Sequence, residues 1–122
     1  MAKILVVEDE ATLLSLVVEL LRLDGYEVNG VADGETGWKM ASTGQFDLVL
    51  LDIQLPGRDG WSVLASLKED PRLQAIPVIM WTGRPSEPDR QKALEMGAVA
   101  YLEKPVSADD LLDTIRAALS AR

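Results

Sequence analysis

The chain has 122 residues, a length typical of one domain with its own hydrophobic core. It contains no cysteine and no histidine, which excludes a disulfide framework, a thiolate metal site and a histidine base. Its formal net charge is −8, from 20 acidic and 12 basic residues, and because such a surface repels phosphate backbones we expect no binding to nucleic acid.

Short apolar segments, each too short for a helix and separated by turn residues, predict buried β-strands. In chain order these are residues 4–7, 26–31, 48–51, 77–81 and 98–102. The first lies near the N-terminus and is far too short for a signal peptide or a membrane span. We therefore expect a cytoplasmic protein that does not enter membranes.

Segments with apolar residues at helical spacing alternate with these strands and predict helices. In chain order these are residues 12–23, 33–44, 61–68, 89–96 and 107–119. Asp33 and Ser107 are predicted N-caps, whereas residues 84–88 are predicted to be loop because they include two prolines. Strands that alternate with helices through short connections predict a parallel sheet covered on both faces, which is a doubly wound α/β fold.

Polar side chains follow the strongest predicted strands at the point where each ends. Glu8 and Asp9 follow the first strand, Asp52 the third, Thr82 the fourth and Lys104 the fifth. If these strands are neighbours, the side chains converge at the carboxyl edge of the sheet, where open α/β sheets bind ligands. Three crowded carboxylates repel one another, and oxygen ligands with room for water suit Mg²⁺. We therefore predict a magnesium site at this edge.

Asp52 is the predicted nucleophile of this site. A carboxylate can accept a phosphoryl group and form an aspartyl-phosphate. Catalysis of such a transfer is mainly positioning and neutralisation of charge on the phosphoryl oxygens, which a metal ion, the ammonium of Lys104 and the hydroxyl of Thr82 can supply. The residue types at this edge therefore predict a phosphoryl-acceptor site.

An ordered set of motifs runs through the chain. These motifs are Glu8-Asp9, Asp52, Leu55-Pro56, Asp59-Gly60, Thr82-Gly83, Tyr101 and Lys104-Pro105. In this order, over essentially all 122 residues, the chain resembles the receiver domain of bacterial two-component response regulators. The resemblance implies one receiver domain over residues 1–122, with a flavodoxin-like five-stranded sheet in the order 2-1-3-4-5.

By this resemblance Asp52 is the phosphoacceptor and, together with Asp9, binds Mg²⁺ or Mn²⁺ directly. Glu8 assists through water, and the backbone carbonyl of Gln54 completes the protein ligands. Gln54 and Arg84 also stand at positions that, in the family, tune the lifetime of the phosphate.

The resemblance further implies a conformational switch. Lys104 pairs with the phosphoryl group or, in its absence, with Asp52. Thr82 moves toward the phosphoryl oxygen on activation, and Tyr101 turns inward into the space that this movement leaves. The switching surface is formed by the fourth helix, the fifth strand and the fifth helix. Trp81 departs from the family pattern, because an aliphatic residue is common before the threonine.

The chain has no histidine, so its phosphoryl donor must lie in another protein, which the resemblance identifies as a histidine kinase or a histidine phosphotransfer protein. The same resemblance implies that a downstream effector protein or a fused output domain reads the signal, and it allows a homodimer through the switching surface. It implies no enzymatic activity beyond assistance of the chain's own phosphorylation and dephosphorylation.

Other functions compete with this interpretation. A receiver fold can serve as an interaction module without phosphorylation, although the complete set of edge residues argues against it. An aspartyl-phosphate phosphatase similar to the haloacid dehalogenases needs a second carboxylate two residues after the nucleophile, where Gln54 stands. A flavodoxin-like binder of flavin mononucleotide needs a phosphate loop after the first strand, whereas Glu8, Asp9 and Glu10 would repel a phosphate.

Overall fold

A computed structural model of the chain describes residues 1–121. The strands in this range are β1 (Lys3–Val7), β2 (Glu27–Val31), β3 (Leu48–Asp52), β4 (Val78–Thr82) and β5 (Ala100–Glu103). The helices are α1 (Ala11–Leu23), α2 (Gly34–Ala41), α3 (Gly60–Glu69), α4 (Glu87–Glu95) and α5 (Ala108–Ser120). No helix among the described residues has the length and apolar character needed to cross a membrane.

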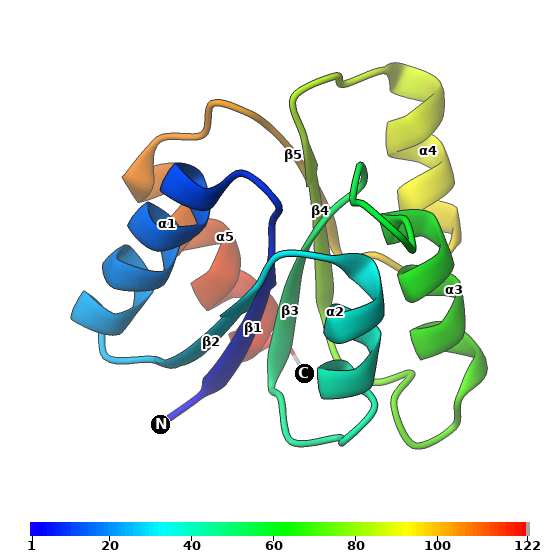
Figure 1. The fold of residues 1–122 in the computed structure, drawn as a ribbon, viewed down its shortest axis with the longest axis horizontal. Coiled ribbons are helices and arrows are strands. Elements are labelled where there is room, and N and C mark those ends of the chain that lie inside the picture. The colour runs from blue at the N-terminus through cyan, green and yellow to red at the C-terminus, as the bar shows by residue number, and fades with distance from the viewer. Residues whose placement is uncertain (122) are drawn as a thin grey trace.

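The strands form one parallel sheet in the order β2-β1-β3-β4-β5. This confirms the predicted doubly wound α/β fold and its strand order. Figure 1 shows α1 and α5 on one face of the sheet and α2, α3 and α4 on the other. Because β3 lies at the centre of the sheet, every residue of this strand is buried, including Asp52 at its end.

Side chains of the central strands alternate between two hydrophobic clusters, because successive residues of a strand point to opposite faces of the sheet. Leu5 and Met80 belong to the cluster that also contains residues of α2, α3 and α4. Val6 and Trp81 belong to the opposite cluster, together with residues of α1 and α5. The strands are therefore held from both sides, and the positions of the side chains at their carboxyl ends are held with them.

Polar N-caps begin most of the helices. Asp33 and Ser107 cap α2 and α5, which confirms both predictions. The prediction that residues 84–88 are loop is wrong for its last two residues, because Ser86 caps α4 and Pro88 lies in the first turn of that helix. Proline is tolerated there because the first amides of a helix have no intrahelical partner.

Candidate functional site

The carboxyl edge of the sheet brings three of the predicted site residues into direct contact. Glu8 follows β1, Asp52 ends β3 and Lys104 follows β5. The Nζ of Lys104 donates to Asp52 Oδ2 at 2.8 Å and also to Glu8 Oε1, so that one ammonium bridges two strand ends. Glu8 is 1% exposed and Asp52 is 4% exposed. The bridge is therefore largely withdrawn from water.

Backbone amides hold the second oxygen of each carboxylate. Asp52 Oδ1 accepts the N–H of Gln54 at 3.0 Å, and Glu8 Oε2 accepts the N–H of Glu10 at 2.8 Å. Each carboxylate thus uses one oxygen to order the loop that follows its strand and the other to bind Lys104. The orientation of both groups is set before any ligand binds.

Burial controls the charges in this cluster. It raises the pKa of the Glu8 carboxyl above its ordinary value, against the hydrogen bonds from Lys104 and from the Glu10 amide, and the charge of Asp52 raises this pKa further. Burial lowers the pKa of the Lys104 ammonium, but the hydrogen bonds to Asp52 and Glu8 outweigh it and the net shift is upward. Lys104 therefore stays charged, whereas Glu8 takes up a proton more readily than an ordinary glutamate.

Three carboxylates lie close enough to share a cation. Glu8, Asp9 and Asp52 each offer one oxygen, and these oxygens all lie within 4.8 Å of one another. Asp9 is exposed whereas the other two are buried, so the group is open to water on the Asp9 side. A set of oxygen donors with access to water suits Mg²⁺, which usually keeps several of its waters. The chemistry of the donor set therefore fits the predicted metal.

A glycine allows the loop after β3 to pack closely behind the acceptor. The N–H of Gly60 donates to the carbonyl oxygen of Ile53 at 2.9 Å. A Cβ at Gly60 would lie 2.1 Å from the carbonyl oxygen of Asp52, so a side chain cannot be accommodated without movement of the backbone. The preceding residue, Asp59, caps α3. The Asp59-Gly60 motif therefore fixes the start of α3 against the strand that carries the acceptor.

Thr82 and Tyr101 have hydrogen bonds outside the carboxylate cluster. Thr82 is 1% exposed, and its Oγ1 accepts the N–H of Arg84 at 3.0 Å. Tyr101 is half-buried in β5, and its hydroxyl accepts the N–H of Ser86 at 3.2 Å. Both side chains thus contact the segment between β4 and α4, which connects the edge of the sheet to that helix.

Trp81 is a contact of this site that the sequence did not predict. The Nζ of Lys104 lies 4.6 Å from the centroid of its ring. Trp81 is 2% exposed, and its Nε1 has no hydrogen-bond partner among the described residues. A bulky residue before Thr82 is a signal that the sequence contains, but the placement of its ring depends on packing against α1 and α5.

Comparisons with known proteins show the family and the fold of the chain. Residues 4–116 match the family described as "Response regulator receiver domain". A CheY-like receiver domain protein from Methanospirillum hungatei JF-1 has a TM-score of 0.92 at 32% identity, covering 99% of this chain and 95% of that chain. The receiver domain of sensor histidine kinase PA1611 from Pseudomonas aeruginosa PAO1 has a TM-score of 0.89 at 29% identity, covering 98% of each chain. That structure has a magnesium ion coordinated in its active-site cleft.

Curated relatives are longer than this chain. The transcriptional regulatory protein HprR of Escherichia coli K12 is 40% identical over 117 residues, which are 96% of this chain and 51% of that protein. The sensory transduction protein RegX3 of Mycolicibacterium smegmatis is 41% identical over 119 residues, which are 98% of this chain and 51% of that protein. The chain therefore spans about half the length of these relatives.

Proposed function

This chain belongs to the response regulator receiver domain family of two-component systems, and from that premise we propose that Asp52 accepts a phosphoryl group from a histidine kinase or a histidine phosphotransfer protein. The observation that carries the proposal is the cluster at the carboxyl edge of the sheet. There Lys104 bridges Asp52 and Glu8, and Asp9 offers a third carboxylate oxygen. This arrangement supplies a nucleophile and groups of both charge signs around it.

The carboxylate of Asp52 is the nucleophile in this proposal. One of its oxygens forms a bond to phosphorus while the bond between phosphorus and the donor imidazole nitrogen breaks, and the imidazole keeps that electron pair. Lys104 already contacts Asp52, so its ammonium needs only a short movement to reach a phosphoryl oxygen. Gln54 lies two residues after Asp52, and Arg84 lies two residues after Thr82. We propose that these two side chains control how readily water attacks the phosphate.

We propose that Asp9, Asp52 and the backbone carbonyl of Gln54 bind Mg²⁺ or Mn²⁺ directly, and that Glu8 assists through water. When bound, such an ion neutralises charge on the transferring phosphoryl group. Lys104 alone does not balance three carboxylates, which favours the entry of a second cation. The magnesium ion in the related receiver domain of PA1611 supports the same choice of metal.

We propose that phosphorylation shifts the surface formed by α4, β5 and α5 between two states. A phosphoryl group on Asp52 adds charge and acceptor oxygens that the hydroxyl of Thr82 can bond, and a switch needs such differences between its states. Movement of Thr82 would displace Arg84, whose backbone N–H donates to the Thr82 hydroxyl. Two residues further along the chain, the N–H of Ser86 donates to the hydroxyl of Tyr101. The change at the site is thereby carried to β5.

Beryllofluoride, which occupies the place of a phosphoryl group, tests this switch. We expect its addition with Mg²⁺ to change the backbone amide NMR signals of Thr82 and Ser86 and those around Tyr101. Changes that remain confined to the loops around Asp52 would contradict the switch without affecting the acceptor proposal.

We propose that residues 1–122 act as one cytoplasmic receiver domain, and that an effector protein or an output domain in the same polypeptide reads its state. Relatives of about twice this length, named as transcriptional regulatory and sensory transduction proteins, support the second arrangement. A homodimer through the surface of α4, β5 and α5 is a further proposed state. Sedimentation with and without beryllofluoride tests it, and we expect the dimer only in the activated form.

Incubation with acetyl phosphate and Mg²⁺, followed by intact mass measurement, tests the acceptor. We expect one added phosphoryl group on the unsubstituted protein and none on Asp52→Asn. Asp59→Asn is the matched control, because Asp59 caps α3 near the site without belonging to the carboxylate cluster. An unmodified protein, or equal modification of Asp52→Asn, would contradict the proposal.

A further inference from the structure

The side chain of Trp81 lies directly against Lys104 of the candidate site. Trp81 precedes Thr82 in β4 and is the sheet partner of Asp52 in β3. The centroid of its ring is 4.6 Å from the Nζ of Lys104, and Trp81 is 2% exposed. The ring is therefore placed beside the acceptor strand and in cation–π contact with the ammonium that bridges the two buried carboxylates.

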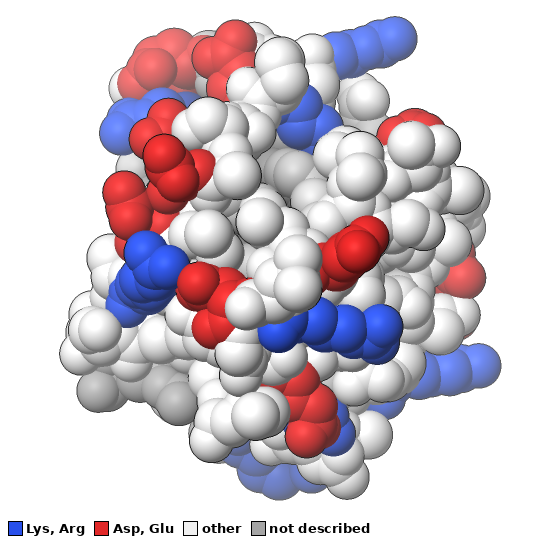
Figure 2. Space-filling model, turned by 90° about the vertical axis from the view of Figure 1, so that its left-hand side faces the viewer, with Lys and Arg blue, Asp and Glu red and all other residues white. Residues whose placement is uncertain are grey.

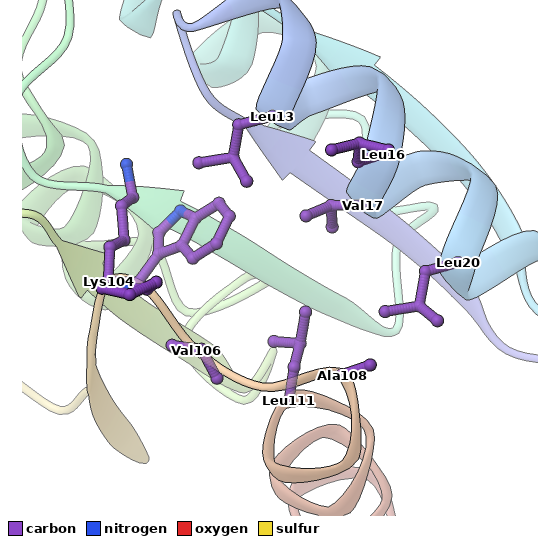
Figure 3. Close-up of a pocket in the computed structure, with 10 residues that line it drawn as sticks. Leu13, Leu16, Val17, Leu20, Lys104, Val106, Ala108 and Leu111 are labelled. Carbon is purple, nitrogen blue, oxygen red and sulfur yellow. The ribbon is translucent and has the colours of Figure 1, made fainter.

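Apolar side chains surround the ring on the face of the sheet covered by α1 and α5. Trp81 belongs to the hydrophobic cluster that includes Val17 of α1 and Leu111 of α5, and it borders a cavity of about 380 Å³. Figure 3 shows Leu13 and Val17 on one side of this cavity and Leu111 on another, while Lys104 extends with its nitrogen away from Leu111. Figure 2 shows the outside of the molecule on the side of α1, where acidic and basic side chains are interspersed among uncharged ones. The ring is thus anchored in apolar surroundings.

The other contacts of Lys104 depend on carboxylate charge. Its ammonium donates to Glu8 and Asp52, and both belong to the proposed metal site, Asp52 as a direct ligand and Glu8 through water. A carboxylate that ligates a cation attracts a neighbouring ammonium less strongly, and the two cations repel each other. The attraction of the ring does not depend on these carboxylates, because it comes from the quadrupole of the π system.

We propose that Trp81 is a positioning residue for Lys104, whose ammonium it keeps beside Asp52 when the carboxylates turn to the metal. This inference rests on the proposed function of Asp52 as phosphoacceptor. A cation–π contact shielded from water corresponds to a factor of roughly three to thirty in the population of the held ammonium. The side chain of Lys104 is 17% exposed, so most of the contact is shielded in this way.

A double-mutant cycle on the rate of phosphorylation by acetyl phosphate, at saturating Mg²⁺, tests this proposal. We expect Trp81→Leu to lower the rate by roughly threefold to thirtyfold, and Trp81→Phe, which keeps a ring, to recover part of it. In a Lys104→Ala background, Trp81→Leu should have no further effect, because the ring acts only through the ammonium. An equal loss of rate in both backgrounds would overturn the proposal.

Trp38→Leu is the matched control. It removes an indole that lies 5.0 Å from the guanidinium of Arg58, in a cation–π contact that does not involve Lys104. We expect this variant to keep the phosphorylation rate of the unsubstituted protein. A loss as large as that of Trp81→Leu would contradict the positioning role.

A measurement without phosphoryl donor separates this inference from the proposed function. This measurement is the NMR order parameter of the Lys104 Cε methylene, recorded with and without Mg²⁺. In the presence of Mg²⁺ it should be lower in Trp81→Leu than in the unsubstituted protein. In Trp38→Leu it should equal the value of the unsubstituted protein. An unchanged order parameter in Trp81→Leu would overturn the positioning role even if phosphorylation occurs. A lowered order parameter in a chain that acetyl phosphate does not modify would support the contact and contradict the acceptor role of Asp52.

Discussion

Replacement of Lys104 by methionine tests the charge balance at the edge of the sheet. Methionine fills a similar length with an apolar side chain but carries no charge. The variant therefore leaves Glu8 and Asp52, which are 1% and 4% exposed, without their shared counterion. Removal of one partner from a buried ion pair costs about 3–5 kcal/mol when the other charge has to stay. Here the carboxylates keep their hydrogen bonds from backbone amides, which places the expected loss at the lower end.

Protonation of Glu8 limits the part of this loss that comes from the charge of Glu8 itself. Protonating a carboxyl whose ordinary pKa is 4.5 costs about 1.4 kcal/mol per pH unit, which is about 3.4 kcal/mol at pH 7 and about 1.4 kcal/mol at pH 5.5. Burial raises the pKa of Glu8 even with Lys104 in place. At a pH above the ordinary pKa of 4.5, the folded state therefore binds more protons than the unfolded state. Stability of the variant therefore falls as pH rises through this window.

Urea unfolding without divalent cations, at pH 7 and at pH 5.5, measures the effect. We expect Lys104→Met to lose about 3 kcal/mol at pH 7 and roughly 1–2 kcal/mol less at pH 5.5, where Glu8 can take up a proton. Lys92→Met is the control, because Lys92 is exposed and its Nζ lies 4.2 Å from the ring of Trp61 rather than between buried carboxylates. A loss at pH 7 no larger than that of the control, or one that is equal at both pH values, would refute the reasoning.

Three further results are expected. Gly60→Ala should lose about 2 kcal/mol of stability in urea unfolding, because its Cβ would lie 2.1 Å from a backbone oxygen of β3. Gly83→Ala is the control and should be near neutral, because its Cβ would meet nothing within 4 Å. Similar losses in both variants would contradict the steric role of Gly60. The affinity for Mg²⁺, measured by tryptophan fluorescence, should weaken as pH falls toward 4.5, because the raised pKa of Glu8 lets a proton compete with the metal. Glu8→Gln should remove most of this pH dependence. An identical pH profile in that variant would contradict the role of Glu8. Tyr101→Phe removes the acceptor of the Ser86 amide, so hydrogen exchange at that amide should accelerate by roughly threefold to tenfold, and an unchanged exchange rate would show that the bond contributes little.

Local chemistry explains which parts of the fold can be predicted from the sequence. Asp33 and Ser107 are recognisable as N-caps because a short polar side chain before a helical pattern satisfies the free amides of the first turn. Pro88 is harder to interpret, since proline is common both in loops and in first turns. Its place in α4 follows from Ser86, whose hydroxyl accepts the N–H of Asp89 and begins the helix earlier than the prolines suggest.

The site was predictable only as far as strand ends could be located. Glu8, Asp52 and Lys104 were expected at one edge because parallel strands present their carboxyl ends together. That Lys104 bonds both carboxylates depends on the spacing of β1, β3 and β5, which are far apart in the sequence. The contact of Lys104 with Trp81 depends in addition on how α1 and α5 pack, and no local pattern encodes that packing.

Chemical identification of the phosphorylated residue tests the central claim most directly. Borohydride reduces an acyl phosphate to an alcohol, so treatment of the protein after incubation with acetyl phosphate and Mg²⁺ converts a phosphorylated aspartate to homoserine, which peptide mass spectrometry locates. We predict homoserine at position 52 and unchanged aspartate at Asp9 and Asp59. Homoserine at either of those positions with Asp52 unchanged, or at none of the three, would contradict the account.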